Sequence, residues 1–172
     1  MIPDGASQLF DEQAVARAYD GLAEKLNAAL PETEVLLLPV MTGGMFTACE
    51  LAPRIHRKQR VDYVHASRYR GNTRGGEIEW LHWPSLPTTV DTVVLIDDIF
   101  DEGHTMAAVR ERLPERYRVF TVALALKRHD RGLARDWVDF YGLEVPDIYV
   151  FGCGMDYREN LRELRAIWKI DA

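Results

Sequence analysis

The stretch Val93-Val94-Leu95-Ile96-Asp97-Asp98-Ile99-Phe100-Asp101-Glu102-Gly103-His104-Thr105 decides the fold class of this chain. Its first four residues are β-branched or aliphatic and belong to a predicted buried strand over residues 92–96. Acidic residues then fill a predicted turn over 97–103, and a helix is predicted over about 104–113. A buried strand that leads through a polar turn into a helix is a building unit of α/β proteins.

Strands and helices are also predicted to alternate on both sides of this stretch. A helix is predicted over 11–30, where apolar residues recur every three or four positions and Asp11 can cap the first turn. The other predicted elements are a helix over 45–56 and strands over 34–39, 61–69, 77–83, 119–126, 137–141 and 148–151. This order predicts an α/β fold with a mainly parallel central sheet flanked by helices, with ligands beyond the carboxyl ends of the strands.

Length and composition indicate one globular domain over residues 1–172, since 47% of the residues are apolar and 28% are charged. The 21 basic and 27 acidic residues give a net charge of -6, which argues against a nucleic-acid-binding or membrane-binding surface.

The longest apolar run, 35–41, is too short to span a bilayer, and residues 1–30 show no secretory signal. We therefore expect a cytoplasmic protein. Cys49 and Cys153 lie far apart, which disfavours a disulfide framework or a structural zinc site.

The acidic turn and the start of the following helix have a chemical use. A helix N-terminus presents unpaired N–H groups to a phosphate, Gly103 allows a close backbone approach, and the Thr105 hydroxyl can donate a further hydrogen bond. Asp97 and Asp98 can accept hydrogen bonds from ribose hydroxyls or hold Mg²⁺. The alternative is an ordinary acidic turn with an aspartate as helix cap. The whole string, from strand to Thr105, favours the phosphate site over that alternative.

The same stretch resembles the phosphoribosyl pyrophosphate (PRPP) signature of type I phosphoribosyltransferases. Other blocks are similar to those of the hypoxanthine-guanine phosphoribosyltransferases and occur in the family order over roughly residues 8–170. These blocks are Met41-Thr42-Gly43-Gly44, Ser67-Arg68-Tyr69 with Gly76-Glu77-Ile78, Leu126-Lys127-Arg128, Gly142-Leu143-Glu144-Val145-Pro146-Asp147 and Gly152-Cys153-Gly154-Met155-Asp156-Tyr157. The resemblance implies the type I phosphoribosyltransferase fold, with a small hood and a flexible lid hairpin that contains Ser67, Arg68 and Tyr69.

The resemblance also implies a role for each matching residue. Asp101 is the catalytic acid or base near N7 of the purine, and Asp97 and Asp98 face the ribose and its Mg²⁺. Asp156 is a ligand of a second Mg²⁺. The residues implied in binding PRPP and its phosphates are Met41, Thr42, Gly43, Glu102, Gly103, His104, Thr105 and Arg162, with a non-proline cis peptide at the Met41 turn. Those implied in purine binding are Lys127, Tyr149 and Val150.

Two residues depart from the family pattern. Many relatives have Lys where Thr42 stands, and the phosphate loop commonly has Thr where Glu102 stands. Because a carboxylate beside a phosphate is unfavourable, we predict that the Glu102 side chain points to solvent while its N–H serves the phosphate. Trp80 and Trp83 are predicted on different faces of a strand and are assigned no function.

The implied activity is Mg²⁺-dependent purine salvage. Hypoxanthine or guanine would react with PRPP to give IMP or GMP and pyrophosphate, which makes the chain a pentosyltransferase. Lys127 suits a 6-oxopurine and disfavours adenine, whose amino group cannot accept from an ammonium. Two alternatives stay open: a xanthine-preferring phosphoribosyltransferase and a non-catalytic nucleotide-sensing regulator on the same fold. By resemblance the protein forms a homodimer or a homotetramer.

Overall fold

The computed structural model describes residues 1–68 and 78–170. In this part of the chain the central feature is a seven-stranded sheet in the order β5-β4-β2-β6-β7-β8, with β3 paired to β2. All its pairings are parallel except that of β4 with β5. This confirms the predicted α/β class with a mainly parallel sheet. The strands are β2 (Val35–Met41), β3 (Gln59–Val61), β4 (Val64–Arg68), β5 (Ile78–His82), β6 (Thr92–Phe100), β7 (Arg118–Lys127) and β8 (Phe140–Val145).

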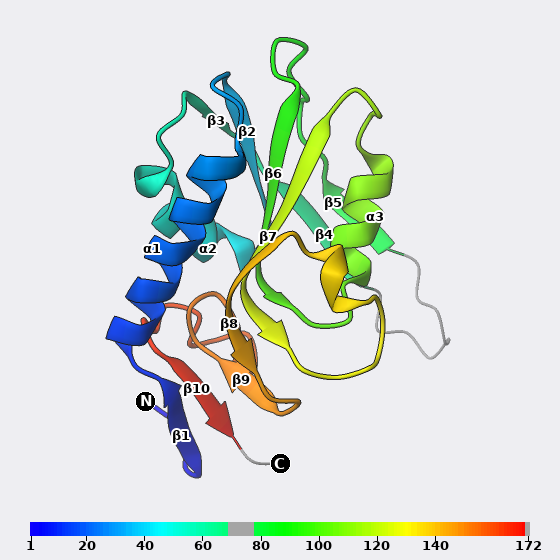
Figure 1. The fold of residues 1–172 in the computed structure, drawn as a ribbon. Coiled ribbons are helices and arrows are strands. Elements are labelled where there is room, and N and C mark those ends of the chain that lie inside the picture. The colour runs from blue at the N-terminus through cyan, green and yellow to red at the C-terminus, as the bar shows by residue number, and fades with distance from the viewer. Residues whose placement is uncertain (69–77, 171–172) are drawn as a thin grey trace.

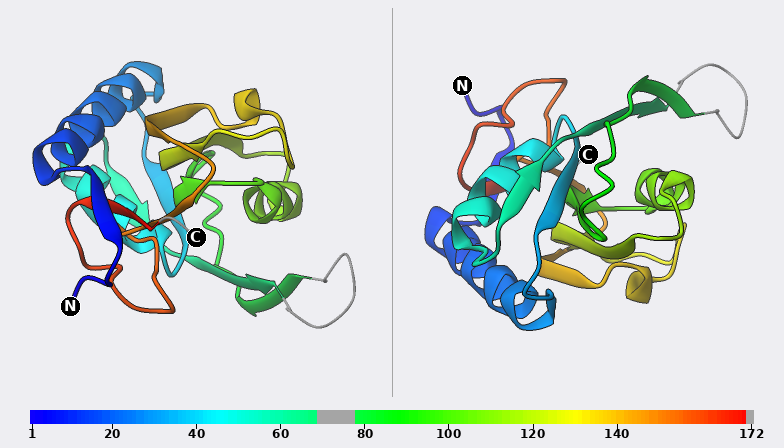
Figure 2. Two further views of the ribbon diagram at one scale, coloured as in Figure 1. Left: turned by 90° about the horizontal axis from the view of Figure 1, so that it is seen from below. Right: turned by 90° about the horizontal axis from the view of Figure 1, so that it is seen from above.

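Helices cover both faces of the sheet (Figures 1 and 2). One face carries α1 (Glu12–Ala29) and α2 (Gly44–Leu51), which continues into the 3-10 turn η1 (Ala52–Arg54), and the other carries α3 (His104–Arg112). Alternate residues of β2 divide between the two cores: Val35 and Leu37 pack with α1 and α2, and Leu36 and Leu38 pack with α3. Asp11 caps α1 as predicted, because its Oδ1 accepts from the Ala14 N–H at 2.7 Å.

A smaller antiparallel sheet lies below the carboxyl ends of the central strands in Figure 1. It has the order β1-β10-β9 and joins both ends of the chain. Its strands are β1 (Ala6–Phe10), β10 (Ile167–Ile170) and β9 (Tyr149–Phe151). The sequence predicted only β9, since β1 and β10 are short and half exposed and carry little local pattern. This sheet occupies the place expected of the hood, and it brings Tyr149 and Val150 to the end of the central sheet.

Several predicted boundaries were wrong. Strand β6 does not stop at Ile96 but continues to Phe100, because its parallel pairing with β7 still joins Asp97 to Ala123 and Phe100 to Leu126. Asp97 and Asp98 therefore stand on a strand rather than in a turn. The predicted helix over 45–56 ends its α-helical part at Leu51, and the predicted strand over 137–141 is replaced by the 3-10 turn η2 (Arg135–Trp137) followed by β8. Tyr69 and the predicted lid tip lie outside the described residues, as do the side chains of Ser67 and Arg68.

Trp80 and Trp83 pack against each other, contrary to the prediction that they occupy different faces. Their rings meet edge to face with centroids 5.1 Å apart, since the chain has left strand β5 at Trp83. The Arg112 guanidinium, at the end of α3, lies 4.6 Å from the Trp80 ring centroid and 4.4 Å from that of Trp83. Arg112 thus joins the β4–β5 hairpin to the helix that follows the acidic turn.

Replacing Arg112 by alanine is expected to lower the free energy of unfolding by about 1–2 kcal/mol. The reason is the loss of two exposed cation–π contacts of about 0.5–1 kcal/mol each. Urea unfolding followed by tryptophan fluorescence measures the change. Glu111→Ala, at the neighbouring exposed position, is the matched control and is expected to stay within about 0.5 kcal/mol of the wild type. Equal changes for the two variants would contradict the contact's role.

Candidate functional site

A cavity of about 370 Å³ opens at the carboxyl ends of the central strands, where the sequence places ligand binding. Its size is that of a small-molecule site. It gathers predicted site residues from five separate segments: Met41, Thr42, Gly43, Asp97, Asp98, Asp101, Thr105, Lys127, Tyr149, Val150, Asp156 and Arg162. The tertiary structure therefore brings these predicted residues together around one space.

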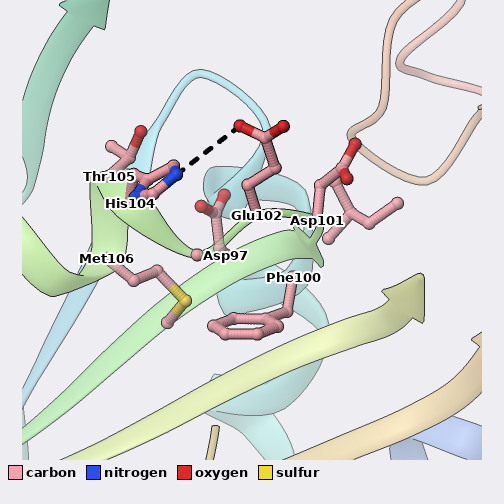
Figure 3. A pocket seen from close by; sticks show the side chains of 9 residues that line it. Asp97, Phe100, Asp101, Glu102, His104, Thr105 and Met106 are labelled. Carbon is pink, nitrogen blue, oxygen red and sulfur yellow. Dashed lines mark ion pairs between the residues drawn. The ribbon is translucent and has the colours of Figure 1, made fainter. Parts of the chain in front are cut away.

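A second cavity, of about 190 Å³, adjoins the first at the N-terminus of α3. Four residues line both: Asp97, Ile99, Asp101 and Thr105. Glu102, Gly103 and His104 line only this smaller cavity. Figure 3 shows Thr105, His104 and Glu102 on one side of the segment, while Phe100 and Met106 lie on the other, in the core.

Gly103 shapes the start of α3. It has φ 75°, and a Cβ at this position would lie 2.5 Å from the Phe100 ring, so only glycine fits. The first residues of α3 line the small cavity, and a helix N-terminus has unpaired N–H groups that suit an anion. His104 is exposed, as expected for a residue at a helix start.

Glu102 lies among basic side chains. Its carboxylate is 3.7 Å from His104 Nε2, the pair dashed in Figure 3, and 4.0 Å from Arg131 Nε. It lines the small cavity with a side chain that is 40% exposed. Its predicted outward orientation with a phosphate bound stays a prediction.

The carboxyl groups of Asp97 and Asp98 lie close together and are largely buried from solvent. Asp97 Oδ1 accepts from the Asp98 N–H at 3.0 Å, and Asp98 Oδ1 accepts from the Ile99 N–H at 2.8 Å. Burial raises the pKa of both carboxyl groups above the ordinary value, and the charge of Asp98 raises that of Asp97 further. A bound cation would relieve this unfavourable arrangement of charge.

The turn after β2 packs directly against Asp98. The Met41–Thr42 peptide bond is cis, as the resemblance implied. A Cβ on Gly43 would lie 2.0 Å from Asp98 Oδ2, and one on Gly154 would lie 2.5 Å from the Gly43 carbonyl oxygen. Glycine at both positions lets three segments of the chain meet beside the Asp98 carboxylate.

Arg162 places a positive charge between two of the predicted carboxylates. Its Nη2 donates to Asp156 Oδ1 at 2.9 Å, its Nη1 donates to the Gly154 carbonyl at 2.6 Å, and Nη1 is 3.9 Å from Asp98 Oδ2. Asp156 Oδ2 accepts from the Glu159 N–H at 2.8 Å. The side chain of Arg162 thus belongs to the cavity, although it comes from a charged stretch that otherwise reads as a solvated surface.

Asp101 receives a donor on each carboxylate oxygen. Lys127 Nζ donates to Oδ2 at 2.8 Å, and His129 Nε2 lies 2.6 Å from Oδ1. Burial would raise the pKa of Asp101, but the hydrogen bonds from Lys127 and His129 outweigh it and hold that pKa below the ordinary value. The Lys127 side chain is only 14% exposed, so it is no solvated surface lysine.

The sequence did not identify His129 as a site residue. A single histidine in a loop after a strand has no pattern that marks it as functional. The only local signal was its position two residues beyond Lys127, which is too weak to identify a contact with Asp101, 28 residues away.

Tyr149 and Val150 lie on β9 at the open side of the cavity. Tyr149 is 45% exposed, and its hydroxyl donates to the Asp156 carbonyl at 2.9 Å. Val150 is buried. An exposed ring at a cavity mouth can stack on a planar ligand.

The carboxylates suit Mg²⁺ better than a fully protein-ligated metal. Over residues 1–68 and 78–170 no group of three or more His, Cys, Asp or Glu side chains is placed to hold a metal ion. Mg²⁺ is usually held by one or two carboxylates together with water and substrate phosphates. Asp97, Asp98 and Asp156 supply oxygens of that kind around the cavity, so the donor set fits this ion.

Among the described helices none is long and apolar enough to cross a membrane.

A protein-family model described as "Phosphoribosyl transferase domain" matches residues 5–160. The hypoxanthine-guanine phosphoribosyltransferase of Bacillus subtilis is 28% identical over 160 residues, which cover 91% of this chain and 88% of the relative. That of Streptococcus pyogenes serotype M3 is 25% identical over 160 residues, with the same coverage of 91% and 88%.

Solved structures show the same fold. A crystal structure of a hypoxanthine phosphoribosyltransferase from Staphylococcus aureus superposes with a TM-score of 0.86 at 24% identity, covering 96% of this chain and 91% of that one. The Trypanosoma cruzi hypoxanthine phosphoribosyltransferase in complex with the product IMP gives 0.80 at 22% identity, covering 99% and 97%.

Proposed function

This chain belongs to the phosphoribosyl transferase family, and from that premise we propose that it is a purine salvage enzyme. It transfers the 5-phosphoribosyl group of PRPP to N9 of hypoxanthine or guanine, giving IMP or GMP and pyrophosphate. The observation that carries this proposal is the pair of adjoining cavities. In them the Asp101–Lys127 pair lies beside the N-terminus of α3, a position that suits a phosphate. The names of the relatives from Bacillus subtilis and Streptococcus pyogenes support the same substrates.

The phosphates are held mainly by backbone N–H groups. The N-terminus of α3, from Glu102 to Thr105, receives the 5′-phosphate in the smaller cavity, where the helix dipole favours negative charge. The turn from Met41 to Gly43 contacts pyrophosphate through its backbone. Arg162 supplies a guanidinium at the same end of the cavity.

The purine lies between Tyr149 and Lys127. The Tyr149 ring stacks on the base, and the Val150 backbone contacts its edge. The Lys127 ammonium has three N–H donors, of which one reaches Asp101, so it can also donate to a 6-oxo group. A 6-amino group offers no acceptor there, which sets the preference for 6-oxopurines.

Asp101 accepts the proton that the purine base loses. When purine N9 bonds to C1′ of the ribose, the ring must lose a proton, and a carboxylate near N7 can take it. The hydrogen bonds from Lys127 and His129 hold the pKa of Asp101 below its ordinary value, so the group is a carboxylate, the form that can accept that proton.

Asp97, Asp98 and Asp156 would hold Mg²⁺ together with the substrate. The ion supplies positive charge that stabilises the departing pyrophosphate. Arg162 adds a protein charge for the same purpose, and it stays in place through its bonds to Asp156 and Gly154.

We also propose that residues 1–172 act as one catalytic domain. The support is that β9 and the segment at Arg162 complete a cavity built on the central sheet. Assembly into a homodimer or homotetramer and a cytoplasmic location stay predictions from the resemblance and the composition.

A pyrophosphate-release assay with PRPP, Mg²⁺ and each of four bases tests the activity. We expect turnover of hypoxanthine or guanine, and a kcat/KM for adenine lower by on the order of 10²-fold or more, because the Lys127 N–H that donates to a 6-oxo group would have no acceptor on adenine. Xanthine as the best substrate would support the xanthine-preferring alternative. Absence of turnover with all four bases would overturn the proposal in favour of a nucleotide-sensing regulator.

A further inference from the structure

His129 is the buried partner of Asp101, and the proposed function gives it no contact with the substrate. It follows β7, and its side chain is only 5% exposed. Its Nε2 lies 2.6 Å from Asp101 Oδ1, while Lys127 occupies the other carboxylate oxygen.

The hydrogen bonds of the His129 ring define which nitrogen carries the proton. Its Nδ1 accepts from the Arg131 N–H at 3.1 Å, so this nitrogen presents its lone pair. In a neutral imidazole the proton is then on Nε2, which donates to Asp101. His129 can therefore orient the carboxylate without carrying a charge of its own.

The loop around His129 is anchored at several points. The Arg131 guanidinium makes two hydrogen bonds to the Asp147 carboxylate, at 2.6 and 2.7 Å. The Leu133 N–H donates to the Glu102 carbonyl at 3.0 Å, and a Cβ on Gly132 would lie 2.3 Å from that same oxygen. The loop is thus docked against the segment that carries Asp101, and the His129 ring has a defined position.

We propose that His129 is a positioning residue, which holds the Asp101 carboxylate in place through its Nε2–H donor while Lys127 also donates to the 6-oxo group of the base. This inference rests on the proposed function of Asp101. Without His129, one lysine would have to fix the carboxylate and bind the base at once. With it, Asp101 keeps a donor on Oδ1 throughout, and the lone pairs left on its oxygens remain for the purine proton.

The titratable and charged groups facing Asp101 are few among the described residues. They are Lys127 and His129 in direct contact, with Arg131 and Glu102 further away. Loss of the His129 donor removes one of the two hydrogen bonds that favour the ionised carboxylate, so the pKa of Asp101 should rise.

The test compares His129→Leu with His129→Gln. We expect the leucine variant to lower kcat about tenfold with KM for PRPP unchanged, and to raise the acid limb of the kcat/KM profile by about one pH unit, equivalent to about 1.4 kcal/mol. The glutamine side chain still carries an N–H donor and is expected to restore both quantities most of the way. His56→Leu, at an exposed histidine remote from the cavity, is the matched control and should match the wild type.

The outcomes separate this inference from the proposed function. Normal kcat and an unshifted acid limb in His129→Leu, with an active wild type, would overturn the positioning role alone. So would equal losses in the leucine and glutamine variants, which indicate a purely structural role. If the wild type turns over none of the four bases, the proposed function fails. NMR titration of ¹³C-labelled Asp101 in the same variants then still tests whether His129 holds its carboxylate.

Discussion

Replacing Asp101 by asparagine is expected to lower kcat by about 10²–10⁴-fold, the usual contribution of a positioned general base. The amide has nearly the same shape but cannot take a proton from the purine. Asparagine keeps only one oxygen acceptor, so one of the two contacts, with Lys127 or with His129, is lost. Binding of PRPP should persist, because the phosphate contacts come from α3 and from the turn after β2.

Steady-state kinetics with hypoxanthine and calorimetric titration with PRPP and Mg²⁺ measure the two effects. Asp130→Asn, at an exposed acidic residue of the adjacent loop, serves as the matched control and should retain wild-type kcat. A near-normal kcat in Asp101→Asn would refute the assigned role.

The pH dependence of kcat/KM is a second test of the role of Asp101. Because the hydrogen bonds lower the Asp101 pKa, the carboxylate stays ionised at neutral pH, and kcat/KM should fall only as pH drops through that lowered value. The Asp101→Asn variant should lose this limb.

Replacing Gly44 by alanine is expected to lower the free energy of unfolding by about 1–3 kcal/mol, as overpacking does in a tight core. The new Cβ would lie 2.4 Å from the Ile96 carbonyl oxygen and 3.1 Å from the Asp97 Cα. Both atoms belong to the backbone of central strand β6, so neither can move aside alone. Relief of the clash must displace α2 or the strand that carries Asp97, and the affinity for PRPP should fall with the stability.

Gly21→Ala is the control for this variant. Gly21 lies inside α1, and a Cβ there meets no atom within 4 Å. Alanine at such a helical position should raise the free energy of unfolding by roughly 0.5–1 kcal/mol. Urea unfolding and PRPP titration of both variants measure the contrast. A Gly44→Ala protein as stable as Gly21→Ala would show that the close approach of α2 to β6 is not required.

Local patterns explain why so much of the fold could be predicted. Alternating or continuous apolar residues and a capping aspartate mark α1, β2, β6 and β7, because secondary structure depends on the nearest few residues. The ends of strands and helices were predicted less accurately. Strand β6 continues through Asp97 because β7 still pairs with it there, and the acidic stretch itself does not encode that pairing. Strands β1 and β10 escaped prediction for a related reason, since each is stabilised by a partner from the other end of the chain.

By itself the sequence determined the chemical parts of this protein: the order of strands and helices, the carboxylates after a buried strand, the glycine at the start of α3 and the Lys127 that follows β7. Only the tertiary structure decided how those parts meet. The contact of His129 with Asp101, the place of Arg162 between Asp98 and Asp156, and the packing of Gly43 against Asp98 join residues far apart in the chain. Distances between such residues depend on how the sheets and helices pack, and local sequence carries no record of them.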